Sequence, residues 1–348
     1  MIKGLTKKLV SYQLQKPYLV LGILLLLLTV AVYGFTTVTV KPSTEAILPA
    51  DNEAVNNLDQ LRATFYGDIV TMVIREDITS YAVLEKIDGV TNRLQLVENV
   101  GSVQSPTTHL QQTYGSIPRD NVEIQEIQYG PLVNSQRSLA VIQVQTDTQA
   151  KTEEIRQLRQ DIESILRGEG LLENTRITGY NMIDLDMFGV IISDFTKITG
   201  IAFTAVLTAL YIIFRSVKKI ILAILPVMYA LVLMLGIGSM LGAELTIISM
   251  VSAAMIMGLG IDFGIHIVTK LYNTQNITKQ HMFESMDELS KGLLGGALTT
   301  STGFLALLAA QLTGMHSLGI YLAIGILGAY IGVIGLLPTI IILLEKPQ

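Results

Sequence analysis

Asp262 is the residue of this sequence whose type and position most directly suggest chemistry. It lies in Gly258-Leu-Gly-Ile-Asp-Phe-Gly-Ile-His266, inside an apolar run that ends at Lys270. An ionisable group inside a membrane span carries a large free-energy cost, so such a residue is a functional candidate by default. Surrounding hydrocarbon favours the neutral form of the acid. We therefore expect Asp262 to bind and release a proton, or to hold a small cation.

Two further sets of polar residues could act together with Asp262. His266 follows four residues later and shares its helical face, so a proton could pass between the two side chains. Thr299, Thr300 and Thr302 lie in a later apolar run, at a depth that we expect to be comparable, and Thr299 and Thr302 could donate hydrogen bonds to the carboxyl. The alternative is a static polar contact that pins two helices together, and Thr hydroxyls in membrane helices often bond to their own backbone.

The composition excludes several classes of function. Half of the 348 residues are apolar and 15% are charged, whereas about 25% are charged in a typical soluble domain. The net charge of −5 leaves no basic excess to hold a phosphate backbone, so we predict no nucleic-acid partner. The absence of cysteine excludes thiolate metal sites, and the four histidines form no HExxH-like pair. We predict no metal, no cofactor and no enzymatic activity.

Charge-free runs predict the organisation of the chain, since crossing about 30 Å of hydrocarbon takes roughly 20 apolar residues in a helix. Residues 17–40, 198–214 and 220–243 each form one such run, and residues 245–269 form a fourth that contains Asp262. The run 292–344 has no Asp, Glu, Lys or Arg and is too long for one crossing. The polar turn from Gln311 to Ser317 divides it, so the sequence predicts six transmembrane helices.

Basic residues predict the orientation of these helices. They precede the first span, and they also lie between the second and third and between the fourth and fifth spans, which places these segments in the cytoplasm. Both termini are then cytoplasmic. The expected domains are residues 1–36 with the first helix, residues 37–196 as an extracytoplasmic domain, and residues 197–348 with helices two to six. The alternative for the first span is a cleaved signal peptide, but no small-x-small site follows Leu28.

The extracytoplasmic segment contains the same pattern twice. Strand-like segments alternate with helical stripes over residues 69–75, 80–97, 100–104, 138–146, 155–166 and 176–179. Two βαβ units predict an α+β domain of two ferredoxin-like units with helices on one face of a sheet. The linker 106–137 between them gives no structural prediction. The alternative for the whole segment is a soluble cap on the membrane domain.

Glycines form a regular stripe in the last span. Gly325, Gly328, Gly332 and Gly335 follow i, i+3, i+7, i+10 spacing. A stripe of small residues allows helices to approach closely. We therefore expect these four glycines to serve helix packing.

Taken together, these patterns resemble one half of a transporter of the resistance-nodulation-division superfamily, in its MmpL-like or hydrophobe/amphiphile efflux branch. The residues that carry the resemblance are Gly258 to His266, Ala297-Leu-Thr-Thr-Ser-Thr-Gly-Phe304, Phe214-Arg-Ser216 with Pro226, and Leu318-Gly319 through Pro338. The resemblance covers nearly the whole chain. It implies secondary transport, driven by an ion gradient through Asp262, that exports hydrophobic, amphiphilic or lipid-like molecules across a prokaryotic plasma membrane.

Two departures from the family pattern shape the expectations further. Family members usually carry two six-helix halves in one chain, so a single half implies a homodimer or a second half on another chain. The family often places Tyr beside the acid, where this chain has Phe263, which removes a hydroxyl from the ion path. Two other functions stay open: a SecD/SecF-type accessory to protein export, and a lipid-sensing membrane domain in which Asp262 would be dispensable.

The expected topology can be tested in this cysteine-free chain. Ser116 lies in the extracytoplasmic segment and Thr274 lies between the fourth and fifth spans, so Ser116→Cys should react with a membrane-impermeant thiol reagent from outside and Thr274→Cys only from inside. Labelling of intact cells against opened membranes measures the difference. Reaction of both thiols from the same side would contradict the topology.

Overall fold

Six helical stretches among the described residues are long and apolar enough to cross a membrane, in agreement with the number expected from the charge-free runs. They cover Pro17–Thr37, Tyr180–Phe214, Val217–Met240, Ser249–Leu271, Lys279–Ala309 and Thr313–Glu345. The structure is a computed structural model. It describes residues 11–41, 67–119, 130–146, 152–272 and 278–345, together with residues 48–49, 52–53, 56–57, 60 and 64.

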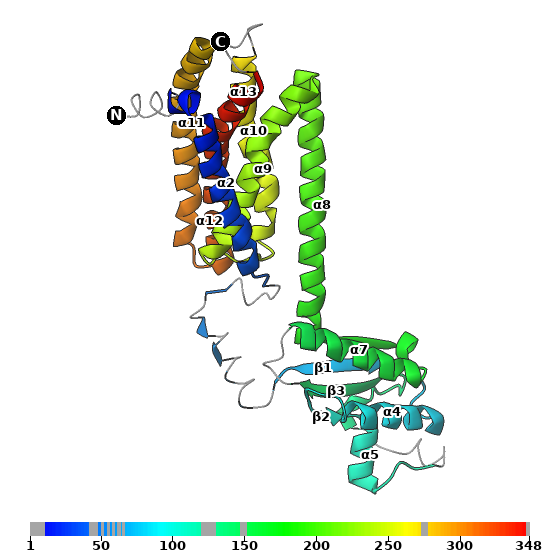
Figure 1. The fold of residues 1–348 in the computed structure, drawn as a ribbon. Coiled ribbons are helices and arrows are strands. Elements are labelled where there is room, and N and C mark those ends of the chain that lie inside the picture. Colours follow the sequence, from blue (N-terminus) through cyan, green and yellow to red (C-terminus); the bar gives the residue numbers. More distant parts are fainter. Residues whose placement is uncertain are drawn as a thin grey trace. The chain divides into compact units, whose positions relative to one another are not determined.

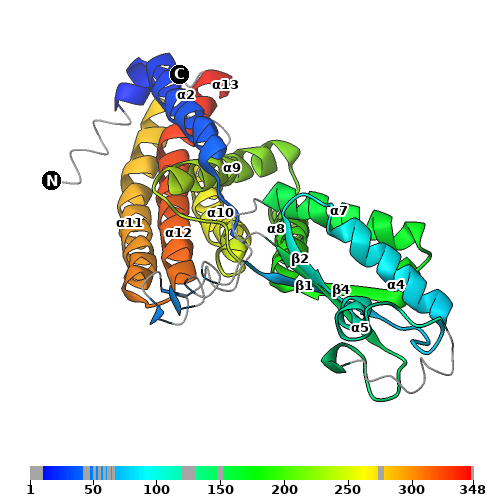
Figure 2. The same cartoon turned by 90° about the horizontal axis from the view of Figure 1, so that it is seen from below.

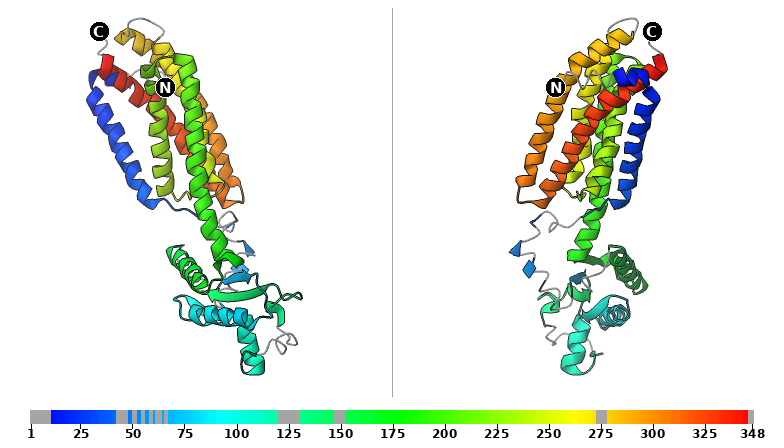
Figure 3. Two further views of the ribbon diagram at one scale, coloured as in Figure 1. Left: turned by 90° about the vertical axis from the view of Figure 1, so that its right-hand side faces the viewer. Right: turned by 60° about the vertical axis from the view of Figure 1, so that its left-hand side comes forward.

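The chain divides into two compact units, which we name the helical unit and the sheet unit. The helical unit comprises Met1–Ala50 and Val190–Gln348, and the sheet unit comprises Asp51–Gly189. The helical unit contains α2 (Pro17–Gly34), η1 (Phe35–Thr37), α9 (Val217–Met240), η5 (Ser249–Val251), α10 (Ser252–Leu271), α11 (Lys279–Leu305), η6 (Ala306–Ala309), α12 (Thr313–Ile331), the π-helical turn η7 (Gly332–Leu336) and α13 (Leu337–Glu345). Figure 1 and Figure 3 show these helices side by side.

One helix, α8 (Tyr180–Phe214), begins in the sheet unit and ends in the helical unit. Its 35 residues extend over about 50 Å at 1.5 Å per residue, whereas hydrocarbon is about 30 Å thick. The helix is therefore longer than one perpendicular crossing requires. Asp186 in its first turns forms an ion pair with Arg159, and this carboxylate raises the pKa of Arg159.

The turn between the fifth and sixth spans lies earlier than the sequence predicts. Helix α12 begins at Thr313, and Ala310 and Leu312 on either side of Gln311 are extended. His316, expected in the turn, is helical, and its Nε2 lies 2.7 Å from the carbonyl oxygen of Ala310. This contact uses a backbone carbonyl that the end of the preceding helix leaves free, so the helix can start before the polar residues end.

The backbones of α2 and α9 approach each other at glycines. A Cβ atom added at Gly236 would lie 1.9 Å from the carbonyl oxygen of Ala31, and one added at Gly34 would lie 2.3 Å from the carbonyl oxygen of Gly236. Such contacts are typical of membrane helices, where small residues replace the hydrophobic effect as the basis of close packing. Helices α10 and α12 also pack against α9, which therefore lies at the centre of the unit.

The sheet unit contains the strands and helices that the repeated pattern predicts. Its strands are β1 (Ile69–Ile74), β2 (Val100–Gln104), β3 (Ala140–Thr146) and β4 (Thr175–Gly179), in the order β2-β3-β1-β4 with all neighbours antiparallel. Helix α4 (Tyr81–Leu94) joins β1 to β2, whereas α7 (Thr152–Gly168) and η4 (Leu172–Asn174) join β3 to β4. Figure 2 shows α4 and α7 side by side.

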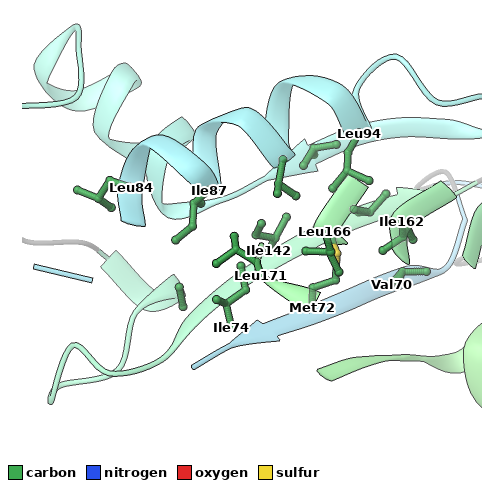
Figure 4. Packing of buried hydrophobic residues seen from close by; sticks show 14 of the residues in the cluster. Val70, Met72, Ile74, Leu84, Ile87, Leu94, Ile142, Ile162, Leu166 and Leu171 are labelled. Carbon is green, nitrogen blue, oxygen red and sulfur yellow. The ribbon is translucent and has the colours of Figure 1, made fainter. Parts of the chain in front are cut away.

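A single hydrophobic core lies between these two helices and one face of the sheet. Val70, Met72 and Ile74 alternate with less buried neighbours along β1, and they meet Leu84 and Ile87 of α4 and residues of α7 (Figure 4). The alternation has the period of a strand with one buried face. In the linker that gave no prediction, the structure describes α5 (Pro106–Tyr114) and η3 (Gly130–Leu132), while residues 120–129 lie outside the described residues.

The close contact at Gly236 predicts that one added methyl group destabilises the fold. Gly236→Ala should lower the free energy of unfolding by about 1–3 kcal/mol, because the added Cβ meets backbone that no side-chain rotation can move away. Gly22→Ala is the matched control on α2, since nothing lies within 4 Å of its added Cβ. Thermal unfolding in detergent measures both variants. Equal melting temperatures of the two variants would contradict the close contact.

Candidate functional site

Helix α10 has one face that packs and one face that is open. A Cβ added at Gly264 would lie 2.3 Å from the carbonyl oxygen of Ala223 on α9, and one added at Gly260 would lie 3.2 Å from the Cβ of Ala329 on α12. The opposite side carries a stripe of exposed residues, which we name the open stripe: Met255, Gly258, Leu259, Asp262, His266 and Thr269. The candidate acid therefore faces away from its own bundle.

Asp262 and His266 lie one helical turn apart on the open stripe, as their spacing predicts. Among the described residues, neither side chain forms an ion pair, and no hydrogen bond joins them. No group of three or more His, Asp or Glu side chains in the described part of the chain could hold a metal ion.

The hydroxyls expected near Asp262 are bonded elsewhere in a single chain. Thr299 donates to the carbonyl oxygens of Gly295 (2.9 Å) and Gly296 (3.1 Å), and Thr302 donates to the carbonyl oxygen of Leu298 (2.8 Å). Each hydroxyl thus serves the backbone of its own helix, which is the usual behaviour of Thr in a membrane helix. Both side chains are exposed.

Thr300 points to a different side of α11 and is half-buried, and the hydroxyl between it and Thr302 belongs to Ser301, which is buried. Ser301 Oγ donates to the carbonyl oxygen of Ala323 on α12 at 3.4 Å. The run of four hydroxyl residues is therefore divided between a face that packs on α12 and a face that is open.

An ion pair between α10 and α11 shows which part of α11 lies beside Asp262. The Nζ of Lys270 lies 2.8 Å from the Oε2 of Glu288. Eight residues back along α10 from this pair lies Asp262, and eight residues forward along α11 lies Gly296, each about 12 Å away along the helix axis. Thr299 and Thr302 then lie about one to two turns beyond the level of Asp262, on the side away from Lys270. By this estimate the two hydroxyls are offset from the acid along the helix axis, where the sequence predicts a comparable depth.

Helix α11 presents a row of small residues that runs past the level of Asp262. Gly292, Gly295, Gly296 and Gly303 are exposed, and an added Cβ at any of them would meet nothing within 4 Å. With Thr299, these glycines form an open face of small residues, which we name the small face of α11. Such a face normally receives another helix at close range.

The glycines of the last span behave differently, because each of them has a close neighbour. Added Cβ atoms would lie 2.5–3.3 Å from atoms of neighbouring helices, with Gly325 against Ile256, Gly328 against Ala230 and Leu233, Gly332 against Pro226, and Gly335 against Leu24. These contacts join α12 and η7 to α10, α9 and α2. The stripe lies inside the bundle, in the place where helix packing requires it.

Gln13 is a buried polar residue that the sequence analysis did not identify. Its Nε2 donates to the carbonyl oxygens of Ile334 (2.8 Å) and Gly335 (3.2 Å), within and at the end of the π-helical turn. Pro338 has no N–H to serve the carbonyl of Ile334, so that oxygen would otherwise be unsatisfied. The sequence does show that Pro338 leaves the carbonyl of Ile334 without its usual helical donor. It does not show which side chain donates instead.

Charged residues gather at one end of the helical unit, which we name the basic end. Lys218 at the start of α9 forms an ion pair with Glu345 at the end of α13, and Tyr272 OH donates to the same carboxylate at 3.0 Å. Lys219 Nζ lies 5.5 Å from the centre of the Tyr272 ring. Burial, the hydrogen bond to Glu345 and the charge of that carboxylate raise the pKa of Tyr272. Three helix ends are thereby held together.

One face of α8 between Thr196 and Ile212 is open and mostly apolar, with Gly200 and Ala205 among its residues. Thr204 on this face donates its hydroxyl to the carbonyl oxygen of Gly200 at 2.9 Å.

Comparison with known proteins agrees with this architecture. The chain is 26% identical over 371 residues to MJ1562 of Methanocaldococcus jannaschii, a protein named as a membrane protein, and the alignment covers 99% of this chain and 95% of that protein. The sequence model of the MMPL family matches residues 46–346, which include the sheet unit and five of the six spans. The chain therefore belongs to the MMPL family, as a half-size member related to the resistance-nodulation-division transporters.

Proposed function

We propose that this protein is a secondary transporter, driven by an ion gradient and in the first instance by protons, that exports hydrophobic, amphiphilic or lipid-like molecules. The observation that carries the proposal is Asp262, an acid in the middle of a membrane-spanning helix on a face that its own chain leaves open. A carboxyl in hydrocarbon costs about 3 kcal/mol or more. A residue retained at that cost is best explained by a function that needs its change of charge.

The open stripe also supports a second copy of the chain as partner. In a lone chain, Asp262 and His266 would face lipid with no hydrogen-bond partner among the described residues. A homodimer in which one copy covers the open stripe of the other removes both groups from hydrocarbon. Two copies also supply the two six-helix halves that larger family members carry, and a second half on another chain would meet the same need.

The small face of α11 supports this assembly. Glycines at Gly292 and Gly296 allow a helix of the partner to approach at backbone distance, at the level of Asp262. Thr299 lies next to them. A partner helix that packs there would meet both the glycines and the hydroxyl, so the coupling site of each copy would be completed by the other.

We further propose that the sheet unit lies outside the cytoplasm and is a ferredoxin-like domain. The order β2-β3-β1-β4 with antiparallel neighbours supports that fold, because each βαβ unit encloses a strand of the other. Lys16, Arg215, Lys218, Lys219 and Lys270 at the basic end support a cytoplasmic location for that end and for both termini.

Two alternatives make different predictions. A SecD/SecF-type accessory to protein export would change the rate of precursor translocation, which an exporter of lipid-like molecules would not. A lipid-sensing membrane domain would not need Asp262. The acid is therefore the residue that separates the alternatives.

The decisive variant is Asp262→Asn. It keeps the shape of the side chain and cannot change charge, so gradient-driven export of a lipid-like dye from proteoliposomes should be abolished. Insertion should not suffer, because the amide costs less in hydrocarbon than an acid. His266→Ala should slow transport less, since water can replace an imidazole but cannot replace a titrating acid.

Glu284→Gln is the matched control for this experiment. Glu284 is an exposed carboxylate on α11 near the basic end, outside the hydrocarbon, and its loss should leave transport unchanged. If Asp262→Asn transports at the normal rate and responds normally to collapse of the proton and sodium gradients, the proposed coupling is wrong.

The proposed homodimer predicts that a large side chain on the small face of α11 disturbs dimerisation but not the folding of the single chain. Gly296→Leu should leave the single chain folded, since an added Cβ meets nothing within 4 Å, but it should raise the monomer fraction in native mass spectrometry and lower transport. Gly22→Leu, an equally open position on α2, is the control. A wild-type protein that is monomeric in active membranes would contradict the proposal.

A further inference from the structure

The chain that leaves the first span is extended after η1. Residues 38–40 are β-branched and a proline follows Lys41, and both features favour extended backbone. Val40 forms a parallel bridge with Leu245, in the turn between α9 and α10. The N–H of Leu245 donates to the carbonyl oxygen of Thr39 at 2.8 Å, and the N–H of Lys41 donates to the carbonyl oxygen of Leu245 at 3.0 Å. Two segments that are far apart in the sequence are thereby joined by their backbones.

An ion pair lies next to this backbone bridge. The Nζ of Lys41 lies 2.7 Å from the Oε1 of Glu244, and the two side chains are 54% and 28% exposed. An ion pair that exposed contributes little to stability. The backbone bonds therefore hold the two segments together, and the charges favour one register of the bridge. We name residues 39–41 together with Glu244 and Leu245 the clasp.

The turn that carries Glu244 is itself bound to α10 and α12. Tyr321 of α12 is fully buried and donates its hydroxyl to the carbonyl oxygen of Ala243 at 2.9 Å. The N–H of Glu244 donates to Ser317 Oγ of α12 at 3.0 Å, and Ser249 Oγ of η5 donates to the carbonyl oxygen of Glu244 at 2.8 Å. Because η5 leads directly into α10, the turn cannot shift unless α10 and α12 shift with it.

Two more contacts fix the same chain to the end of the helical unit that lies opposite the basic end. Before the clasp, the backbones of α2 and α9 are in close contact at Gly34 and Gly236. After it, Thr313 at the start of α12 donates its hydroxyl to the carbonyl oxygen of Leu48 at 2.9 Å. The ends of α2, α9, α10 and α12 on this side therefore form one body, and the chain is bound to that body at the clasp and again at Leu48.

The sheet unit is linked to the helical unit by two stretches of chain that are held differently. The first is the chain that passes through the clasp and leads to β1. The second is α8, whose membrane-spanning part is 6% buried, compared with 56% in α9 and 50% in the span that contains α10. Movement of the body that carries Asp262 therefore reaches the first link directly, whereas α8 does not have to follow it.

We infer that the clasp is a permanent junction that transmits movement of this body to the sheet unit. The inference rests on the proposed function, in which a change of charge at Asp262 shifts the bundle against its partner. Asp262 lies about 15 Å along the helix axis from the start of α10 at Ser252. Close contacts with α9 and α12 prevent α10 from sliding alone, so its displacement moves the turn at Glu244 and Lys41 with it. Lys41 and Glu244 touch neither cargo nor coupling ion and are positioning residues.

Cross-linking tests the junction without cargo or a gradient. Paired strands lie about 4.8 Å apart, which suits a disulfide, whereas a residue two positions along the strand would be about 8 Å away. Val40→Cys with Leu245→Cys should therefore cross-link nearly completely in mild oxidant, and Val38→Cys with Leu245→Cys should cross-link roughly tenfold more slowly or less. Equal rates for the two pairs, or no cross-link in the first, would show that the clasp is not formed in the membrane.

Export by the cross-linked protein tests whether the junction is permanent. The disulfide between positions 40 and 245 holds the clasp closed, so the oxidised protein should export a lipid-like dye at the rate of the reduced protein. A junction that has to open during transport would instead be blocked by the disulfide and released by reduction. That result would overturn the inference.

Two neighbouring proline substitutions test the transmission of movement. Lys41→Pro removes both the N–H that donates to Leu245 and the ammonium group that pairs with Glu244. Val40→Pro is the matched control, because the N–H of Val40 donates to no acceptor among the described residues. Lys41→Pro should lower export several-fold with little change in melting temperature, since the buried contacts of the bundle are intact. Val40→Pro should export at a nearly normal rate.

Charge reversal supplies a rescue that a general loss of stability would not show. Lys41→Glu places two carboxylates side by side and should lower export, whereas Lys41→Glu combined with Glu244→Lys should restore it. Normal export by Lys41→Pro, or no recovery in the exchanged pair, would overturn the transmission. The proposed function can fail separately. Normal export by Asp262→Asn would reject the acid as the source of the movement, while the disulfide and the exchanged pair would still decide whether the clasp transmits it.

Discussion

The architecture of the helical unit depends on one constraint: hydrocarbon offers no water to hydrate a carboxyl. Asp262 lies in the middle of α10, and its side chain is exposed in the single chain. A carboxyl in that position needs polar partners, and the described part of the chain does not supply them. A second six-helix half, as proposed, would supply the missing cover for this side chain. It would also give the open stripe of α10 and the small face of α11 one common explanation.

Close backbone packing explains why the bundle cannot bury the acid by itself. Gly260 and Gly264 each stand two residues from Asp262, which is about 200° around the helix. These glycines bring α10 against α12 and α9 at distances that admit no extra methyl group without movement. The side of α10 that makes these contacts is thus nearly opposite to the acid. The glycines that fasten α10 to its bundle also fix the direction in which Asp262 points.

The sequence was most informative where one physical signal dominates. Long charge-free runs gave six spans, and alternating apolar residues gave β1 and β3 to within two residues of their observed ends. The pattern Gly-Ile-Asp-Phe-Gly also indicates the side of the helix on which Asp262 lies, since the two glycines fall nearly opposite to the acid. The depth of Thr299 relative to the acid could not be obtained, because helix register depends on contacts such as that of Lys270 with Glu288. The role of Gln13 depends on residues more than 300 positions away and leaves no local trace.

Helix α10 thus has a packed side and an open side, and along the open side its residues differ with depth. Around the helix axis, small residues on one side give rigidity, because the close contacts with α9 and α12 cannot slide without a clash. On the other side, polar and apolar residues are divided by depth, with the acid at the boundary between them. A rigid helix keeps that boundary fixed relative to its own bundle, so any change in what Asp262 can reach must come from movement at the open stripe. If Asp262 couples transport to an ion gradient as proposed, its two access states therefore have to differ at the open stripe and not on the packed side of α10.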